Sequence, residues 1–299
     1  MIQGMASYGR YVMAGFLTIF GSVGVVRAQL VSDSVRVGPH YRSYHYTKPS
    51  GTDRPRSLVF VLHGSGGDGR SMQRAVRTLE PAARRQQTLV VYPDAYKRFW
   101  NECRKASPAA ANQEDVDEQG FFSGMIAALQ KQYGIDPKQV FVVGTSGGGH
   151  MAYKLGLTMP GTFRAITAII ANLPDSTNLD CVPSGRALPV MIVNGTEDPI
   201  NPYEGGAVVL GGNMNMGRVR STGQTLAYWA GLAHHTGQPT LEKLPDTNPG
   251  DGRTVERYTY HAAGKPDVVL LKVIGGKHDY PGDIDVHLEA LRFFGQQIR

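Results

Sequence analysis

The fold is decided by the stretch Val140-Phe-Val-Val-Gly-Thr-Ser146-Gly-Gly-Gly-His-Met-Ala-Tyr-Lys-Leu155, where an apolar run breaks into Gly-x-Ser-x-Gly and then continues with helical composition. Residues 139–143 predict a short buried strand, and residues 146–157 predict a helix. A serine hydroxyl is a weak nucleophile at neutral pH, so it must be placed where a base and a substrate both reach it. A sharp strand-to-helix turn flanked by glycines achieves this placement. The pattern therefore predicts a nucleophile at Ser146.

A second apolar run, residues 57–62, ends in His63-Gly64-Ser65-Gly-Gly, so small residues follow another predicted strand. When a serine nucleophile stands on such a turn, this loop gives one backbone N–H to the oxyanion, and the residue after the serine gives the other. We therefore assign the oxyanion hole to the amides of Ser65 and Gly147, with Gly64 as the alternative to Ser65.

The acid and the base are expected after the serine, in the chain order Ser, Asp, His. Asp198 follows the apolar run 188–194, and His278 follows the apolar run 268–274. Each candidate lies past the carboxyl end of a predicted strand, at the edge where open α/β sheets gather their sites. Glu197 and Asp279 are the competing carboxylates for the role of the acid.

From about Tyr46 to the C-terminus, the chain resembles the secreted α/β-hydrolase esterases of the polyhydroxybutyrate depolymerase and feruloyl or acetyl-xylan esterase type. The motifs that carry the resemblance are His63-Gly64, Tyr92-Pro-Asp94, Trp100-Asn101, Asp115-Val-Asp-Glu118, the serine turn, Gly195-Thr-Glu-Asp198-Pro, Pro202-Tyr-Glu-Gly-Gly206 and Gly275-Gly-Lys-His278. The resemblance implies that Ser146, Asp198 and His278 form a catalytic triad. It also implies ester hydrolysis through an acyl-enzyme, without a cofactor or a metal.

The loop around the expected base departs from the family's usual Gly-Gly-Gly-His-Thr-Trp-Pro-Gly. Here Lys277, Asp279 and Tyr280 replace a glycine, a threonine and a tryptophan. We therefore expect Lys277 and Tyr280 to make the substrate pocket beside His278 more polar than is usual, with a cation near the bound ester.

Two further segments are candidates for the pocket wall. Trp100 lies in a loop at the same sheet edge, and two interpretations stay open for it: a core residue or a wall on which the substrate stacks. The glycine-rich segment 205–217 is expected to form a flexible rim or short lid, and two interpretations stay open for Met214 and Met216: side chains that only fill space, or soft side chains beside an apolar acyl group.

The alternation of strands and helices predicts an α/β fold: the α/β-hydrolase fold, with a mostly parallel sheet, helices on both faces and no separate cap domain. The expected strands are a pair near 34–48 and single strands at 57–62, 88–92, 139–143, 164–170, 188–194, 254–261 and 267–274. The expected helices are 71–85, 116–133, 146–157, 222–235 and 284–297. Asp115 and Glu118 fit a capping box at the start of the second helix.

The N-terminal segment predicts export. Arg10, the apolar stretch 11–26 and the small residue Ala28 are typical of a secretory signal peptide over residues 1–28, with an uncleaved membrane anchor as the alternative. Residues 29–299 would then form one catalytic domain in a secreted or periplasmic protein. The net charge of +6 is modest, and the arginines of 70–85 fit a solvated helix face. We expect no nucleic-acid partner and no stable membrane association after removal of the signal.

The two cysteines, Cys103 and Cys181, both lie in loops that follow strands at the same edge of the sheet. Because export permits oxidation, we favour a disulfide over two separate thiols. The chain has no C-x-x-C spacing, and we expect no metal site.

A competing motif is Gly64-Ser-Gly-Gly-Asp-Gly69, which matches the dinucleotide-binding G-x-G-x-x-G, with Asp94 in place to bind a ribose. The strand pair before residue 57, the export signal and the complete triad argue against this interpretation. Among the histidines, we expect His63 to hold its loop and His150 to pack beside the nucleophile. The pair His234-His235 suits a helix C-terminus rather than a metal.

These observations predict an exported serine carboxylic-ester hydrolase that acts on short-acyl or hydroxyalkanoate esters, either small or polymeric. One alternative is a feruloyl or acetyl-xylan esterase that acts on plant polysaccharide. An alternative of another class is a non-catalytic, exported polymer- or carbohydrate-binding protein on the same fold. The intact triad argues against that alternative, because a binding module needs no nucleophile, acid and base together.

Overall fold

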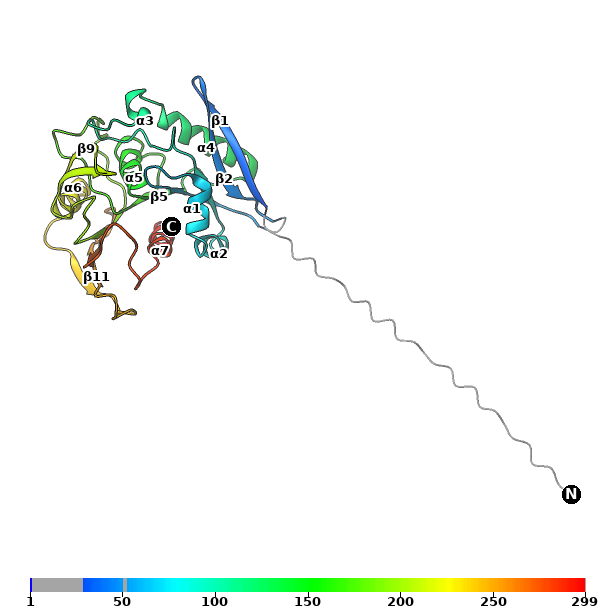
Figure 1. Ribbon diagram of the computed structural model, residues 1–299. Coiled ribbons are helices and arrows are strands. Elements are labelled where there is room, and N and C mark those ends of the chain that lie inside the picture. The colour runs from blue at the N-terminus through cyan, green and yellow to red at the C-terminus, as the bar shows by residue number, and fades with distance from the viewer. Residues whose placement is uncertain (2–28, 51–52, 299) are drawn as a thin grey trace.

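The computed structural model describes Met1, residues 29–50 and residues 53–298 (Figure 1). The expected signal peptide therefore lies, apart from Met1, outside the described residues. Among those that are described, no helix is both long enough and apolar enough to cross a membrane.

The described residues form one large mixed sheet whose centre is parallel and whose two edges are antiparallel. In sheet order its strands are β1 (Leu30–Val37), β2 (His40–Thr47), β4 (Thr88–Pro93), β3 (Ser57–Leu62), β5 (Val140–Thr145), β6 (Ala165–Ile169), β7 (Val190–Gly195), β12 (Val268–Ile274), β11 (Thr254–Tyr260) and β10 (Thr240–Lys243). The strands from β4 to β12 pair in parallel. Parallel strands are buried on both faces, which is why the central strands read as continuous apolar runs.

Helices cover both faces of this sheet. Helices α1 (Gly69–Ala75), α2 (Leu79–Arg85) and α7 (Val286–Gln297) lie together on one face (Figure 1). Helices α4 (Glu118–Tyr133), α5 (Gly147–Thr158) and α6 (Thr222–Leu232) cover the other, and α3 (Ala110–Gln113) is a single turn before α4. The α/β-hydrolase fold class is confirmed.

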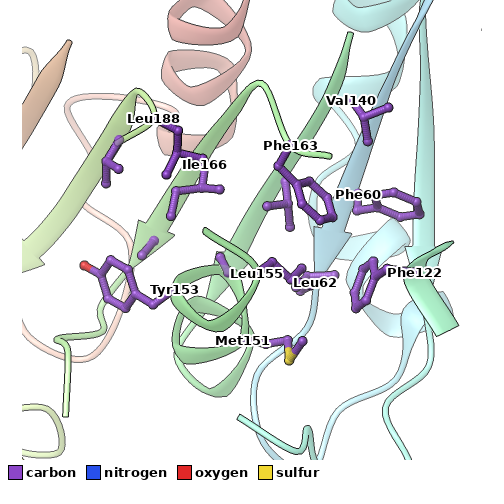
Figure 2. Packing of buried hydrophobic residues seen from close by; sticks show 14 of the residues in the cluster. Phe60, Leu62, Phe122, Val140, Met151, Tyr153, Leu155, Phe163, Ile166 and Leu188 are labelled. Carbon is purple, nitrogen blue, oxygen red and sulfur yellow. The ribbon is translucent and has the colours of Figure 1, made fainter. Parts of the chain in front are cut away.

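The two apolar cores follow from the alternation of side chains along each strand. In β3, Phe60 and Leu62 belong to the core under α4 and α5, whereas Val59 and Val61 belong to the core under α1, α2 and α7. Figure 2 shows the first core, where Met151, Tyr153 and Leu155 of α5 and Phe122 of α4 pack against the sheet. Helix α5 is thereby fixed against the strands beneath it, and its first residue directly follows Ser146.

One expected helix is in fact two. The segment expected as a single helix over 71–85 breaks between α1 and α2, around Val76 and Thr78. Pro81 explains the break: proline lacks an N–H, and its ring would clash with a carbonyl four residues earlier in a continuous helix. In the observed structure Pro81 lies in the first turn of α2, where proline is tolerated.

The expected capping box at Asp115 and Glu118 is wrong. Helix α4 begins one residue after Asp117, whose side chain accepts a hydrogen bond from the Gly120 N–H at 2.7 Å. Glu118 is buried and points away from the cap, because its carboxylate pairs with Arg42.

The glycine-rich segment expected as a flexible rim forms an antiparallel hairpin of β8 (Gly206–Leu210) and β9 (Met214–Val219), with a register shift between Ala207 and Val209. This hairpin is a two-stranded sheet separate from the main one. Positive φ angles at Gly211 and Gly212 make its tight turn. Strand β10 was also not expected, since all its residues are exposed and show no apolar alternation.

Candidate active site

The backbone at Ser146 has the conformation of a nucleophile elbow. Ser146 lies between β5 and α5 with φ 54° and ψ −116°, a combination that residues with a side chain rarely adopt. Two glycines make the turn possible. A Cβ added at Gly144 would lie 2.0 Å from the Gly148 carbonyl oxygen, and one added at Gly148 would lie 2.5 Å from that of Leu62. The turn therefore packs tightly against β3 and exposes the serine hydroxyl at the carboxyl edge of the sheet.

A chain of hydrogen bonds joins the three residues expected to form a triad. His278 Nε2 lies 3.0 Å from Ser146 Oγ, and His278 Nδ1 lies 2.7 Å from Asp198 Oδ2. The other Asp198 oxygen accepts from the backbone N–H groups of Ile200 and Asn201, each at 2.8 Å. Because both carboxylate oxygens are held, Asp198 has a fixed orientation toward the imidazole. A histidine placed in this way can accept the serine proton while the carboxylate supports the resulting charge.

The two competing carboxylates are placed elsewhere. Glu197 is exposed, whereas Asp198 is buried. Asp279 forms a two-pronged ion pair with Arg253, at 2.8 and 2.9 Å, and hydrogen bonding from that guanidinium lowers the pKa of Asp279. In the described part of the chain, Asp198 is the carboxylate that contacts His278.

The two residues whose amides are assigned to the oxyanion hole, Ser65 and Gly147, lie side by side. A Cβ added at Gly147 would lie 2.9 Å from the Ser65 nitrogen. Gly147 is the first residue of α5, so its N–H has no partner within the helix. Within residues 29–50 and 53–298, neither amide donates to a protein acceptor, whereas the next two amides of the loop, those of Gly66 and Gly67, bond to backbone carbonyls. Both N–H groups are therefore without a protein acceptor in this part of the chain.

Ser146 and His278 open into a cavity of about 720 Å³, a size typical of small-molecule sites. Its apolar wall consists of Phe99, Ile170, Ile200, Leu210 and Met214. Of the three residues expected in the pocket, Tyr280 lines it, and its hydroxyl lies 2.8 Å from Thr145 Oγ1.

The other two expected pocket residues do not line the cavity. Trp100 is 2% exposed, and its indole N–H donates to the His63 carbonyl at 2.9 Å, so it is a core residue. Its neighbour Phe99 faces the cavity instead. Lys277 is exposed and is absent from the lining, so the wall contains no cation from this position. Met216 is buried within the β8–β9 hairpin, and only Met214 of the expected methionine pair reaches the cavity.

Sequence reasoning missed Phe99, Ile170 and Ile200. Each lies in a loop at the carboxyl edge of the sheet. Ile170 has a positive φ of 47° directly after β6, and Ile200 follows Asp198 by two residues. Position at this edge is the signal that would have marked all three as candidates.

Two buried histidines flank the site. His63 Nδ1 donates to the Gly64 carbonyl and its Nε2 accepts from the Ala95 N–H, so His63 holds its loop as expected. Burial lowers the pKa of His63 and keeps the ring neutral. His150 is also buried, and burial lowers its pKa well below the usual value, with Arg104 and His278 adding to the effect. The structure places His150 beside the nucleophile as a packed neighbour.

The segment with the dinucleotide-type glycine pattern is committed to internal contacts. A Cβ added at Gly69 would lie 2.3 Å from the Tyr92 carbonyl oxygen, so the loop is packed against β4. Asp94 accepts from the Gly69 N–H and from His45. Burial favours a raised pKa for Asp94, but hydrogen bonds from His45, Gly69 and Ser43 outweigh it and lower the pKa to about 2. Asp94 is thus a structural carboxylate.

Cys103 and Cys181 are joined in a disulfide, as the sequence favours. Within the described residues, the one cluster of Cys, His, Asp and Glu compact enough for a metal consists of these cysteines and Asp180. A disulfide offers no thiolate ligands, so this cluster is a cross-link. The ring of His235, from the pair at the end of α6, lies 2.8 Å from the Pro266 carbonyl.

Comparison with known proteins places this site in a family. Residues 48–242 match the model of the phospholipase/carboxylesterase family. A putative esterase, NocK, from Nocardia uniformis subsp. tsuyamanensis is 27% identical, over 86% of this chain and 76% of its own. Feruloyl esterase C from Emericella nidulans is 27% identical over 56% of this chain, and poly(3-hydroxybutyrate) depolymerase from Ralstonia pickettii is 29% identical over 52%. The chain spans 59% of that feruloyl esterase and 34% of that depolymerase.

The solved structure of an acetyl xylan esterase from Aspergillus awamori superposes with a TM-score of 0.58 at 16% identity, over 89% of this chain and 99% of that one. This likeness shows the fold alone. The family match and the esterases among the relatives identify the protein as an esterase rather than a binding module. The chain belongs to the phospholipase/carboxylesterase family and is a serine esterase with the α/β-hydrolase fold.

Proposed function

We propose that this esterase hydrolyses short-acyl or hydroxyalkanoate esters through Ser146, His278 and Asp198. The observation that carries the proposal is the continuous hydrogen-bond chain from Ser146 Oγ through the His278 ring to Asp198. The expected signal segment and the disulfide support export, because disulfides persist in oxidising compartments.

The reaction follows from the roles of these atoms. His278 Nε2 accepts the proton of Ser146 as Oγ attacks the ester carbonyl carbon, and the Ser65 and Gly147 amides donate to the oxygen that becomes negative. Asp198 stabilises the protonated imidazole. His278 then gives its proton to the departing alcohol, which leaves an acyl group on Ser146. Water repeats the attack, with His278 as the base, and releases the carboxylic acid and the free serine.

The cavity supports small or medium acyl groups. Its volume and its apolar lining suit an apolar chain, and its wall consists of loops at the sheet edge together with the β8–β9 hairpin. The second candidate activity is that of a feruloyl esterase. The aromatic rings of Phe99 and Tyr280 in the cavity wall favour it, and so do the feruloyl esterases among the relatives.

The assignment of the nucleophile is tested by Ser146→Ala. We expect kcat/KM for p-nitrophenyl butyrate to fall by about a thousandfold or more with an unchanged Tm, because only the binding and oxyanion contributions remain. A fluorophosphonate probe should label the wild type and not this variant. Ser184→Ala, which removes an exposed serine, is the matched control and should label normally. Labelling of Ser146→Ala would contradict the proposal.

The substrate class is tested with p-nitrophenyl esters from acetate to decanoate, methyl ferulate and 3-hydroxybutyrate oligomers. We expect the highest kcat/KM for short-acyl esters or the oligomers. A steady rise from butyrate to decanoate would contradict this substrate class. A marked preference for methyl ferulate would favour the second candidate.

A further inference from the structure

The β8–β9 hairpin forms one wall of the cavity beside Ser146. Its turn places Leu210, Gly211, Asn213 and Met214 in the lining. Behind the turn, Val208, Met216 and Val219 form a small buried cluster of the hairpin itself. The hairpin is separate from the main sheet, so the position of this wall depends on how its strands are anchored.

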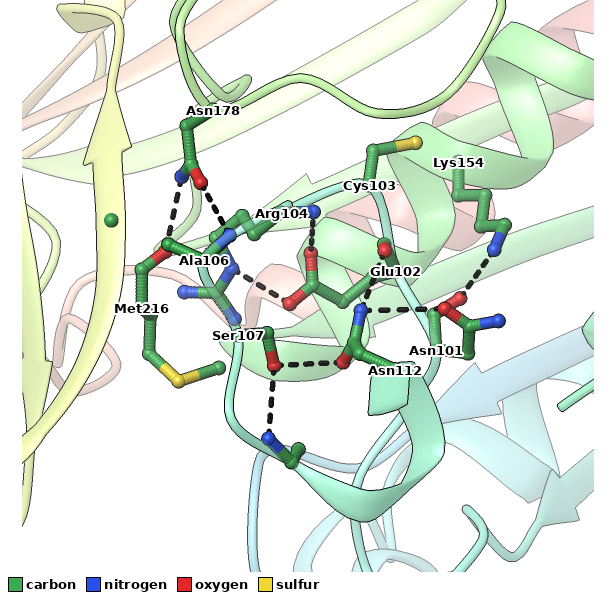
Figure 3. Close-up of polar contacts among 12 residues, drawn as sticks. Asn101, Glu102, Cys103, Arg104, Ala106, Ser107, Asn112, Lys154, Asn178 and Met216 are labelled. Carbon is green, nitrogen blue, oxygen red and sulfur yellow. Dashed lines mark hydrogen bonds and ion pairs between the residues drawn. The ribbon is translucent and has the colours of Figure 1, made fainter. Parts of the chain in front are cut away.

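One anchor is Asn178, a 3% exposed residue in the loop between β6 and β7, which acts beside the backbone hydrogen bonds that join residues 173–175 to Arg218 and Arg220. Its Nδ2 donates to the carbonyls of Met216 and Arg218 in β9, both at 3.0 Å, and its Oδ1 accepts from the Ala106 N–H at 2.9 Å. Figure 3 shows the Asn178 side chain between β9 and the loop that contains Arg104 and Ala106. This side chain thereby links the middle of β9 to the loop of residues 104–106.

The shape of β9 at this point depends on a glycine. Gly217 has a φ of +76°, and an added Cβ would lie 2.4 Å from both the nitrogen and the oxygen of the Asn178 amide. The absence of a side chain at 217 lets the backbone pass close to Asn178, so that the two flanking carbonyls reach the same Nδ2.

Asn178 itself is held by the disulfide-bonded loops. Its backbone carbonyl accepts from the Lys105 N–H at 2.7 Å, and the Asp180 N–H donates to the Cys103 carbonyl at 3.2 Å. The Cys103–Cys181 bond closes this pair of segments. Through Asn178, the hairpin therefore contacts a part of the chain that a disulfide cross-links.

We propose that Asn178 is a positioning residue for substrate selection, because it fixes the hairpin so that Leu210 and Met214 contact the acyl chain. The proposal rests on the proposed function, since it takes the cavity beside Ser146 as the acyl site. An acetyl group ends near the reacting carbon, whereas a hexanoyl chain extends along the cavity wall. Loss of the anchor should therefore penalise hexanoate more than acetate, and it should do so through KM.

The experiment compares Asn178→Ala with Asn112→Ala. Asn112 lies in the same polar layer (Figure 3) and makes a similar set of bonds, to the Glu102 carbonyl, Asn101 and Ser107, but none to the hairpin. We expect the ratio of kcat/KM for p-nitrophenyl hexanoate to that for acetate to fall by about tenfold in Asn178→Ala, mainly through KM. In Asn112→Ala the ratio should stay within about twofold of wild type, because mutations at independent sites affect each other by no more than this.

Further variants keep the proposal open to contradiction if Asn178→Ala does not fold. Gly217→Ala keeps the Asn178 amide but displaces β9, and Leu210→Ala shortens the wall directly; both should lower the same ratio. A wild-type ratio in folded Asn178→Ala or Gly217→Ala, with Ser146 still labelled by fluorophosphonate, would overturn the positioning role. Failure of the proposed function gives a different result, since Ser146 would then not be labelled even in wild type.

Discussion

Asp198 and Glu197 are neighbours in the chain with opposite environments. Asp198 is buried and bonded on both carboxylate oxygens, whereas Glu197 is exposed to solvent. We expect Asp198→Asn to lower kcat/KM by about ten-thousandfold, because an amide favours the wrong histidine tautomer and cannot support the imidazolium. Glu197→Gln should change kcat/KM by less than about twofold, as is usual for surface positions. Steady-state kinetics on one ester measures kcat/KM for both variants. A larger loss in Glu197→Gln than in Asp198→Asn would move the role of the acid to Glu197.

At the scale of single residues, the sequence predicted which residues lie at the edge of the sheet better than it predicted which way their side chains point. Ser146, Asp198 and His278 were chosen because each follows an apolar run that ends at the same edge of the sheet, and hydrogen bonds join the three in the structure. Trp100 and Phe99 are also at this edge, but which of two adjacent loop residues points inward depends on backbone angles that no periodicity reveals. The direction of the Lys277 side chain was not predictable for the same reason: it is exposed, although it directly precedes the proposed base.

The contact between β2 and the start of α4 is a buried ion pair. Arg42 of β2 lies 3.0 Å from Glu118, which also accepts from the Asn101 N–H, and the guanidinium stands over the Phe121 ring. We expect Glu118→Ala to lower the free energy of unfolding by about 3–5 kcal/mol, because it leaves a buried guanidinium unpaired. Urea denaturation measures this loss.

The control for this prediction is Asp117→Ala, one residue earlier. It removes only the helix cap, so it should cost about 1 kcal/mol. The double variant Arg42→Met/Glu118→Leu should cost less than Glu118→Ala alone, because it removes both charges together. If Asp117→Ala and Glu118→Ala lower the free energy of unfolding equally, the ion pair does not stabilise the contact between β2 and α4.

At the scale of elements, the buried strands and the helices α4, α5 and α7 were predicted to within about two residues, whereas the β8–β9 hairpin and β10 were not predicted. The central strands are apolar on both faces, which gives a strong signal. The β8–β9 hairpin contains several glycines, and its strands make contacts with residues distant in sequence, such as Asn178. The break between α1 and α2 was a missed local signal, since Pro81 was visible in the sequence.

Stability of the whole molecule should depend on His287, which is buried in the first turn of α7 under the Tyr280 ring. Burial lowers the pKa of His287 to about 4, although the nearby Asp285 carboxylate acts in the opposite direction. The unfolded chain has a histidine pKa of about 6.5. Between these values the unfolded chain binds a proton that the folded protein does not, so the free energy of unfolding falls as the pH falls.

We expect this group to contribute a loss of about 2 kcal/mol between pH 7 and pH 4.5. Urea denaturation at the two pH values should show a smaller loss in His287→Gln than in the wild type. Equal losses in the two proteins would show that His287 does not control this part of the acid sensitivity.

The catalytic site can form only after the last strand, β12, has joined the middle of the sheet. Ser146 and Asp198 belong to the middle of the chain, but His278 arrives with β12, the last strand of the chain, which inserts between β7 and β11. The residues joined at the site are 132 and 80 positions apart. A polypeptide that ends before β12 therefore has a serine and a carboxylate with no base between them, and we expect fragments of this kind to be inert toward esters and fluorophosphonate. Labelling by fluorophosphonate should therefore report that the whole sheet has assembled. In a series of urea concentrations, the labelled fraction should fall at the same midpoint as the tryptophan fluorescence of the folded core.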